Sequence, residues 1–551
     1  MSTQEDDLRA ELGRAARSVG APADFVPLLE RPRDPAFGDW TTNAAMILAK
    51  ELRQKPRDIA AALIAAVDRE RGGVSTADIA GPGFINFRVS SDRMAHGLFA
   101  LLHAGERFGK VNVGGGQPVN VEFVSANPTG PLHVGHGRQA ALGDAISAML
   151  EWTGWRVTRE FYYNDAGAQI DNLGLSVQAR VRQMRGLDDA IPEGGYHGEY
   201  IREIAARYAA EHPKDMNADD LAEVRSFAVR ELRKEQDRDL QAFGVKFDVY
   251  YLESSLYSDG KVDETVTGLK TAGHTYEKDG AVWLRTTEYG DDKDRVVLRS
   301  AEKGGAPTYF VPDVAYHVTK WQRGFARAIN VQGADHHSTV TRVRIGLQAL
   351  DMGIPRGYPE YVLHQMVTVM KAGEEVKISK RAGSYVTVRD LVDEVGRDAV
   401  RYFYLMRKGD SQLVFDVDLA RAQSEENPVY YIQMSHARMS GIFRVGEINP
   451  AAITGEGVNL TVLQLPEEQE LIKALLDFPA EVQGAADALE PHRMATYLHD
   501  LAGKTHTWYH KAHVLNEPEE ITKARLVLAR AAQIILKNGL ALLGISAPER
   551  M

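Results

Sequence analysis

Hydrophobic and polar positions in the first fifth of the chain predict helices around a short strand. Apolar residues recur at helical spacing in PRDIAAALIAAVDRE (Pro56–Glu70). Further on, Gly81, Pro82 and Gly83 form a turn signal, after which apolar and other side chains alternate over Phe84–Phe87. We therefore expect a separate α+β domain over residues 1–112, followed by a glycine-rich linker in VNVGGGQP.

From about residue 113 to residue 395, strand-like and helical patterns alternate. The strand-like runs are WRVTREFYYN, FDVYY, AVWLR, RVVLRS and RAINVQG. This alternation is typical of a mostly parallel sheet of Rossmann type. A charged helical section over residues 186–243 interrupts it, and we expect an insertion that covers the sheet with a solvated outer face.

The remainder of the chain predicts helices only. Residues 396–428 contain an amphipathic connecting region, and Asn427-Pro428 marks a break before residues 429–551. The run LARAAQIILKNGLALLGI repeats apolar residues at the spacing of a helix in a bundle core. The fold class expected is therefore a multidomain α/β protein, with a Rossmann-type parallel-sheet domain between an N-terminal α+β domain and a C-terminal all-α helical domain.

Composition narrows the functional classes. At 551 residues and 44% hydrophobic content, several globular domains are expected, and no stretch approaches the roughly 18 apolar residues of a membrane span. The chain has no cysteine, which excludes disulfides and thiolate metal sites. The first residues lack the pattern of a secretory signal, so we expect a cytoplasmic protein. The net charge of −11 argues against indiscriminate DNA binding but leaves room for RNA on a local basic face.

Val119–Ile146 is the stretch around which the chemistry is expected. Val119–Val124 predicts a strand, a loop broken by prolines and glycines follows, and helix-forming residues begin near His136. Such a helix start binds anions through its unpaired N–H groups. His133 and His136 flank Gly135, so backbone and two imidazoles could meet a phosphate. Taken alone, a Gly/Pro-rich connection with capping histidines explains the pattern equally well.

A second basic stretch, VKISKRAGSYVTV, lies about 240 residues downstream. It contains Lys377, Ser379, Lys380 and Arg381 between glycines, where flexible ammonium groups could reach a triphosphate. By itself this would be a solvated charge run. The two stretches together, in this order, predict a nucleotide site.

Other polar residues allow a rival interpretation. GADHH (Gly333–His337) follows a predicted strand, and His133, His136, Asp335, His336 and His337 could be metal ligands of a hydrolase. There is no HExxH helix, and the spacing fits a nucleotide better, so we expect no structural metal. Three carboxylates, Glu122, Glu253 and Asp313, are individually explained as surface acids or helix caps.

The two stretches resemble the signatures of class I aminoacyl-tRNA synthetases. HVGH is similar to HIGH and KISKR to KMSKS, with Val134, Ile378 and Arg381 as minor departures. The surroundings resemble the arginyl-tRNA synthetase family from end to end, in motifs that include EFVSANPTGPLHVGH, YYNDAGAQI, FDVYYLES, YFVPDVAYH, GADHH, NPVYYIQMSHAR and LKNGLALLGISAPERM.

The resemblance implies an arginine-tRNA ligase that uses L-arginine, ATP with Mg²⁺ and tRNA-Arg, and that acts as a monomer. It implies catalysis by His133, His136, Lys377 and Lys380 and ATP binding by Gly135, Gly333, Asp335, His336 and Ser379. It implies arginine binding by Glu122, Asn127, Glu253, Tyr309 and Asp313, and contact with the tRNA elbow by Phe84 and Asn86. Two alternatives remain: a non-catalytic relative that binds tRNA, or a class I synthetase for another amino acid.

By the same resemblance, residues 429–551 form the anticodon-binding domain. Eight aromatic or polar residues could stack and pair with loop bases. They are Tyr430, Gln433, His436 and Arg438 in one segment and His506, Trp508, Tyr509 and His510 in another. We expect about half of them to be core residues instead.

Overall fold

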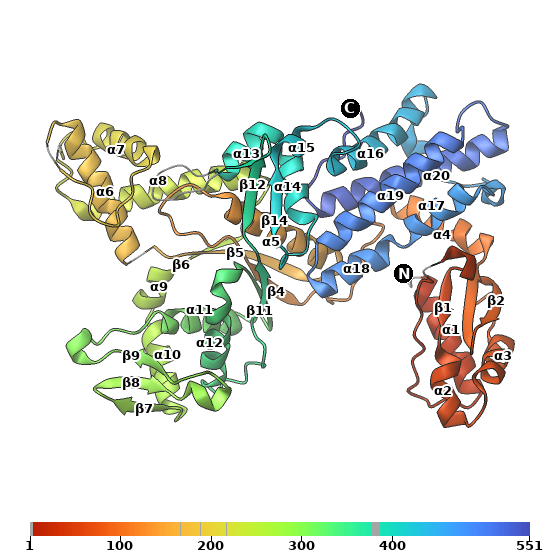
Figure 1. The fold of residues 1–551 in the computed structure, drawn as a ribbon, viewed down its shortest axis with the longest axis horizontal. Helices are drawn as coiled ribbons and strands as arrows, with labels where there is room; N and C mark the ends of the chain where they lie inside the picture. The colour runs from red at the N-terminus through yellow and green to blue at the C-terminus, as the bar shows by residue number, and fades with distance from the viewer. Residues whose placement is uncertain (1–3, 33, 166, 188, 216, 377–385) are drawn as a thin grey trace.

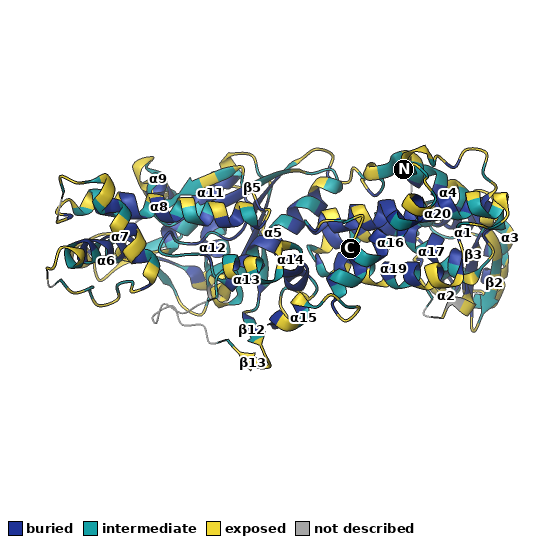
Figure 2. Cartoon of the chain, turned by 90° about the horizontal axis from the view of Figure 1, so that it is seen from above, coloured by how far each residue is buried: buried dark blue, intermediate teal, exposed yellow. Residues whose placement is uncertain are grey.

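The computed structural model describes residues 4–32, 34–165, 167–187, 189–215, 217–376 and 386–551. These residues form an elongated molecule, with helices α6 (Ala168–Met184) and α7 (Glu199–Glu211) at one end and the N-terminal domain at the other (Figures 1 and 2). None of the helices in the described ranges is long and apolar enough to cross a membrane. The parallel sheet lies near the middle of the molecule (Figure 1).

The N-terminal domain has an antiparallel sheet of order β1-β3-β2. Its elements are α1 (Gln4–Ser18), β1 (Trp40–Thr42), α2 (Ala44–Leu52), α3 (Pro56–Ala66), β2 (Val74–Ala80) and β3 (Phe84–Val89). The predicted alternation in β3 is confirmed, because Ile85, Phe87 and Val89 are buried. Phe84 and Asn86 therefore lie together on the other, more exposed face of the strand.

The next helix, α4 (Ser91–Ala104), connects this domain to the C-terminal helices. Ser90 caps it by accepting a hydrogen bond from the Arg93 N–H, and the helix packs against α17 (Pro466–Leu476) and α20 (Glu519–Leu542). The glycine-rich segment that follows is not a free linker. The Gly114 and Gly116 N–H groups donate to the carbonyls of Thr153 and Gly154, and a Cβ at Gly114 would lie 2.6 Å from the Trp155 ring. Glycine is needed there for close packing.

The central sheet is wholly parallel, with the order β11-β10-β4-β5-β6. Its strands are β4 (Pro118–Glu122), β5 (Arg156–Tyr163), β6 (Val249–Leu252), β10 (Arg327–Gly333) and β11 (Glu360–His364). The chain builds outward from β4 through β5 and β6, and then starts again on the other side with β10. This arrangement confirms the Rossmann-type prediction and places the strand-order switch, where such sheets bind ligands, between β4 and β10.

Two of the predicted strands do not join this sheet. AVWLR and RVVLRS form β8 (Ala281–Leu284) and β9 (Arg295–Leu298), which pair antiparallel with each other and with β7 (Thr275–Lys278). Asp279 and Gly280, both at positive φ, make the two-residue turn between β7 and β8. A parallel connection needs a crossover of a dozen or more residues. Because this turn has only two residues, the strands that it joins must be antiparallel.

The charged helical section also differs from its prediction. Helices α6, α7 and α8 (Leu221–Ala242) share a hydrophobic core of their own, which includes Leu173, Ile204 and Phe227. In Figure 1, α6 and α7 project beyond the β6 edge of the sheet instead of covering it. Only the C-terminal end of α8 joins the main core, through Leu240 and Phe243.

Between the strands, further helices pack beside the sheet: α5 (Val134–Trp152), α9 (Glu253–Ser258), α10 (Lys261–Thr271), α11 (Phe310–Gln322) and α12 (His337–Gln348). A third small sheet contains β12 (Val367–Lys371), β13 (Glu374–Glu375) and β14 (Leu413–Asp416). It is accompanied by α13 (Val388–Val395), α14 (Arg397–Leu405) and α15 (Val417–Arg421).

The C-terminal part is helical, as predicted. It consists of α16 (Pro428–Val445), α17, α18 (Phe478–Ala488), α19 (His492–Lys511) and α20. Arg401 of α14 is fully buried where this bundle meets the sheet domain. It donates to the Leu543 carbonyl just after α20 and to the Asp144 carboxylate of α5, so it joins the two parts.

Candidate active site

The first predicted signature forms the N-terminus of α5. His133 is the N-cap, and its Nδ1 accepts a hydrogen bond from the Gly135 N–H at 3.1 Å. The Nδ1 of His136 accepts from the His133 N–H at 3.3 Å, and the two rings stack with their centroids 3.7 Å apart. Because Nδ1 is the acceptor in both neutral rings, the ring proton lies on Nε2. The capping and phosphate interpretations are therefore compatible.

After the second predicted signature, the chain returns to the first. Lys377, Ser379, Lys380 and Arg381 lie outside the described residues. Immediately after them, the Val388 N–H donates to the Leu132 carbonyl at 2.9 Å, and Thr387 pairs with His133 in an isolated antiparallel bridge. Two stretches far apart in sequence thus converge on one loop.

The predicted ATP residues on the other side of the switch point lie at the end of β10. Gly333 ends the strand, and Asp335 and His336 follow in the 3₁₀ turn Ala334–His336, with side chains 82% and 55% exposed. The Gln139 amide of α5, in the orientation that satisfies both groups, accepts from the Gly333 N–H and donates to the Val124 carbonyl. The carboxyl ends of β4 and β10 and the start of α5 therefore lie next to one another.

Three carboxylates from distant parts of the sequence lie near one another close to these strand ends, although no local sequence pattern predicted it. Glu122 ends β4, Glu253 begins α9, and Asp313 lies in the first turn of α11. Burial, and then the charges of Glu253 and Glu122, raise the pKa of Asp313 to about 7. No described residue donates a hydrogen bond to the Asp313 carboxylate. These three residues, called here the carboxylate cluster, therefore hold negative charge that a cationic ligand would compensate.

The three carboxylates are not equivalent. The Tyr162 hydroxyl donates to Glu253 at 3.0 Å, and burial raises the pKa of Glu253. Glu122, by contrast, is buried and already paired: the Lys320 ammonium donates to one oxygen at 2.5 Å, and the Ser125 hydroxyl donates to the other at 2.9 Å. Glu253 and Asp313 thus carry the charge that lacks a basic partner among the described residues.

Asn127 and Tyr309, the other predicted arginine residues, have different surroundings. The Asn127 amide donates to the Gln169 side chain at 2.7 Å, while Tyr309 precedes α11 and is 79% exposed. The sequence reasoning missed three tyrosines, Tyr162, Tyr257 and Tyr361, whose pKa is raised first by burial and then by charges that include Asp313. Tyr162 lies in the YYNDAGAQI motif, but only the sheet register brings it to Glu253.

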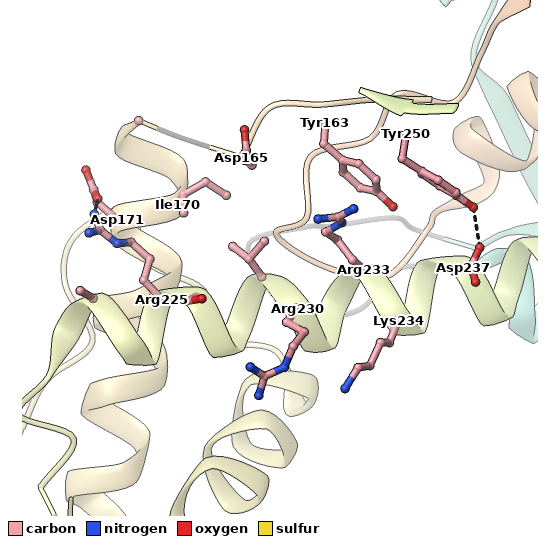
Figure 3. A pocket seen from close by; sticks show the side chains of 14 residues that line it. Tyr163, Asp165, Ile170, Asp171, Arg225, Arg230, Arg233, Lys234, Asp237 and Tyr250 are labelled. Atoms are coloured by element: carbon pink, nitrogen blue, oxygen red, sulfur yellow. Dashed lines mark hydrogen bonds and ion pairs between the residues drawn. The ribbon is translucent and has the colours of Figure 1, made fainter. Parts of the chain in front are cut away.

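A groove near the carboxylate cluster is lined by both basic and acidic side chains, with Arg225 paired to Asp171. It has a volume of about 780 Å³ and lies between α8, the start of α6, Tyr163 at the end of β5 and Tyr250 of β6 (Figure 3). The Arg233 guanidinium lies 4.5 Å from the Tyr163 ring centroid, and the Tyr250 hydroxyl donates to Asp237 at 2.6 Å. Arg230 and Lys234 extend from the same helix (Figure 3). Cations next to aromatic rings are the features that bind single-stranded nucleic acid.

The predicted anticodon residues divide between core and surface. Gln433, His436, His506 and Trp508 are buried, whereas Tyr430, Arg438, Tyr509 and His510 are not. Arg438, Tyr509 and His510 line a groove of about 960 Å³ between α16 and α19. The Arg438 guanidinium lies 5.8 Å from the Tyr509 ring centroid. The expectation that about half of the eight belong to the core is confirmed.

The rival metal interpretation finds no support in the described part of the chain. No group of three or more histidine, aspartate or glutamate side chains there could hold a metal ion. His133 and His136 use Nδ1 to cap α5, and Asp335 and His336 are exposed on a different element.

Family models match almost the whole chain. The arginyl tRNA synthetase N-terminal domain matches residues 5–89, the class I (R) tRNA synthetase catalytic domain matches residues 98–441, and the DALR anticodon binding domain matches residues 432–551. The chain belongs to the arginyl-tRNA synthetase family.

Relatives and solved structures agree with this family. Arginine-tRNA ligases of Geotalea daltonii and Geobacter metallireducens are 56% and 54% identical, over 95% of both chains in each case. An arginyl-tRNA synthetase structure from Campylobacter jejuni is 31% identical, with a TM-score of 0.78 over 84% of this chain and 100% of that one. The Thermus thermophilus arginyl-tRNA synthetase, 23% identical, matches the fold with a TM-score of 0.76 over 99% of each chain.

Proposed function

We propose that this arginyl-tRNA synthetase family member activates L-arginine with ATP and transfers it to the terminal adenosine of tRNA-Arg. The observation that carries the proposal is the carboxylate pocket beside the α5 N-terminus, in which Asp313 has no described hydrogen-bond donor and a pKa of about 7. Such a pocket is arranged for a cation, next to a helix start that is suited to phosphate.

Arginine fits this pocket because of its shape as well as its charge. A guanidinium is planar and presents five N–H donors, which can form paired bonds to a carboxylate. Asp313 and Glu253 offer those acceptors, and Tyr309 and Asn127 are the further residues proposed to contact arginine. Lysine is a compact point charge and cannot form the same paired geometry, so the pocket should discriminate against it. This is also the argument against a class I synthetase for another amino acid.

In the activation step, the arginine carboxylate attacks the α-phosphorus of ATP, and pyrophosphate leaves. His133, His136 and the first N–H groups of α5 stabilise the phosphate charge, while the close approach requires glycine at position 135. Gly333, Asp335 and His336 hold the ribose and adenine side. Lys377, Ser379 and Lys380, which lie outside the described residues, are proposed to complete the phosphate site. Catalysis then rests mostly on positioning and charge.

In the transfer step, the 2′-hydroxyl of the terminal adenosine attacks the arginyl carbonyl, and AMP leaves. The tRNA spans several surfaces of the elongated molecule. Phe84 and Asn86 face outward on β3 and suit an unstacked elbow base, and the Arg438 and Tyr509 groove suits the anticodon loop. The groove along α8 offers Arg230, Arg233 and Lys234 to backbone phosphates of the incoming end.

Further parts of the proposal concern the setting of the reaction. Mg²⁺ accompanies ATP as part of the substrate, the enzyme acts as a monomer, and it works in the cytoplasm. The working units are residues 1–112, 113–395 with the insertion at 186–243, 396–428 and 429–551.

The deciding experiment measures attachment of labelled arginine to tRNA-Arg with ATP and Mg²⁺. Lysine and a non-cognate tRNA serve as controls. Charging that requires both arginine and tRNA-Arg supports the proposal. Binding of tRNA without any charging would favour the non-catalytic relative, and charging with another amino acid would favour a different specificity.

A further inference from the structure

Lys320, near the C-terminal end of α11, is a fully buried cation inside the wall of the proposed arginine pocket. Its exposed fraction is 0%, and its ammonium lies 2.5 Å from a Glu122 oxygen and 3.0 Å from the Asn330 side-chain oxygen. The ammonium also lies 4.5 Å from the centroid of the Tyr316 ring. Burying a lysine so completely is costly unless it is paired, so these contacts determine where it sits.

The contacts of Lys320 continue to the other side of the pocket. The Asn330 amide nitrogen lies 2.8 Å from Nε2 of His317, and Nδ1 of that ring lies 2.7 Å from the Asp313 carbonyl. Burial, together with the nearby Lys320 charge, lowers the pKa of His317 to about 3, so the ring is neutral. Nε2 therefore accepts from Asn330, and Nδ1–H donates to Asp313. A continuous buried chain links the Glu122 carboxylate to the backbone that carries Asp313.

We propose that Lys320 is a positioning residue for amino-acid recognition. It neutralises and orients Glu122, so that Asp313 and Glu253 meet the substrate cation. The inference rests on the proposed function, since it concerns the same pocket. It assigns Glu122 a different role from the one that the sequence resemblance implied, because both Glu122 oxygens already have partners, Lys320 and Ser125.

The charge balance explains why this residue matters. With Lys320 in place, the pocket contains three carboxylates and one ammonium. Without it, Glu122 would be a third buried acid lacking a cation, free to reorient or to take up a proton shared with its neighbours. Either change removes the fixed geometry around Asp313, and a proton held in the cluster would have to leave before a guanidinium could bind. Arginine binding should therefore weaken even though no contact to the substrate is removed.

The test uses calorimetric titration of the full chain with arginine, together with charging kinetics. We expect K320M to weaken arginine binding about tenfold or more, and to raise the arginine KM more than it lowers kcat. The KM for ATP should stay within about twofold. K320R keeps a positive charge but places a larger group in a fully buried site, so it should recover only part of the binding lost in K320M.

A double variant and a matched control separate positioning from folding. E122Q/K320M removes both charges and should recover most of the binding lost in K320M, because no uncompensated acid remains. R525M is the control: Arg525 pairs with the buried Glu468 inside the helical domain, far from the pocket in sequence. It should change stability without changing arginine binding.

The outcomes distinguish this inference from the proposed function. Unchanged or tighter arginine binding in a folded K320M overturns it, as does a double variant that binds no better than K320M. If the wild-type chain binds no arginine, the proposed function and this inference both fail. If the wild type binds arginine but K320M binds it equally well, only the role of Lys320 fails.

Discussion

Replacing Asp313 with asparagine should have opposite effects on stability and on arginine use. The Asp313 carboxylate lies near Glu253 and Glu122. Its burial, and then the negative charges of these two residues, raise its pKa from the ordinary 3.8 to about 7. No described residue donates a hydrogen bond to it. The ionised form is therefore unfavourable in the free enzyme and favourable only when a cation is bound.

The shift gives a scale for the effect on stability. About three pKa units correspond to roughly 4 kcal/mol, which is an upper bound on the cost of the ionised group. Because the folded pKa lies above the unfolded one, the folded state is favoured by protonation. That stability is fully present below about pH 4 and is lost as the pH rises through about 7. The neutral asparagine should therefore stabilise the ligand-free protein at pH 8 and have little effect near pH 4.

The effect on arginine use has the opposite sign. An asparagine side chain carries no charge for the guanidinium, so the variant should lose about 2–5 kcal/mol in kcat/KM for arginine, the usual scale for a broken buried pair. For the wild type, arginine affinity should rise with pH through about 7, as Asp313 ionises. The variant should lack that dependence.

Two assays test the predicted effects of D313N on stability and on arginine use. Denaturant unfolding at pH 8 and near pH 4 measures stability, and charging of tRNA-Arg at pH values on both sides of 7 measures arginine use. Asp487→Asn, at an exposed site on α18, is the control and should change neither. A D313N variant that is less stable at pH 8, or that uses arginine as well as the wild type does, would refute the reasoning.

Three further predictions follow from the other surfaces. H136A should lower kcat by roughly 10²–10³ because a donor to the phosphates is lost; a drop of less than about tenfold in single-turnover kinetics would remove His136 from this role. F84A/N86A should raise the tRNA KM roughly 5- to 100-fold and leave the arginine KM unchanged, because the variant loses only the contact between β3 and an RNA base. An unchanged tRNA KM would contradict this. R438A should weaken tRNA binding and reduce its dependence on salt, as filter binding between low and moderate salt can check; an unaltered slope would exclude a phosphate contact.

Local sequence patterns predicted many of the helices and strands. The alternation over Phe84–Val89 predicted which side chains enter the core, because successive residues of a strand face opposite sides. The strand, loop and helix start around His133 were likewise predictable, since a helix needs a cap wherever its first N–H groups lack partners. The apolar spacing of the C-terminal segments predicted a helical bundle, because residues three and four apart lie on one face of a helix.

Long-range pairing was decided only by the tertiary structure. AVWLR and RVVLRS have strand composition, but composition does not say which sheet a strand joins. The eight anticodon candidates divided evenly between core and surface because a helix face becomes buried only when another helix packs on it. Glu122 was expected to bind substrate, yet it pairs with Lys320, 198 residues further along the chain. The sequence by itself determined which chemical groups the molecule has, while the fold determined which of them neutralise one another, since electrostatic partners are chosen by distance in space.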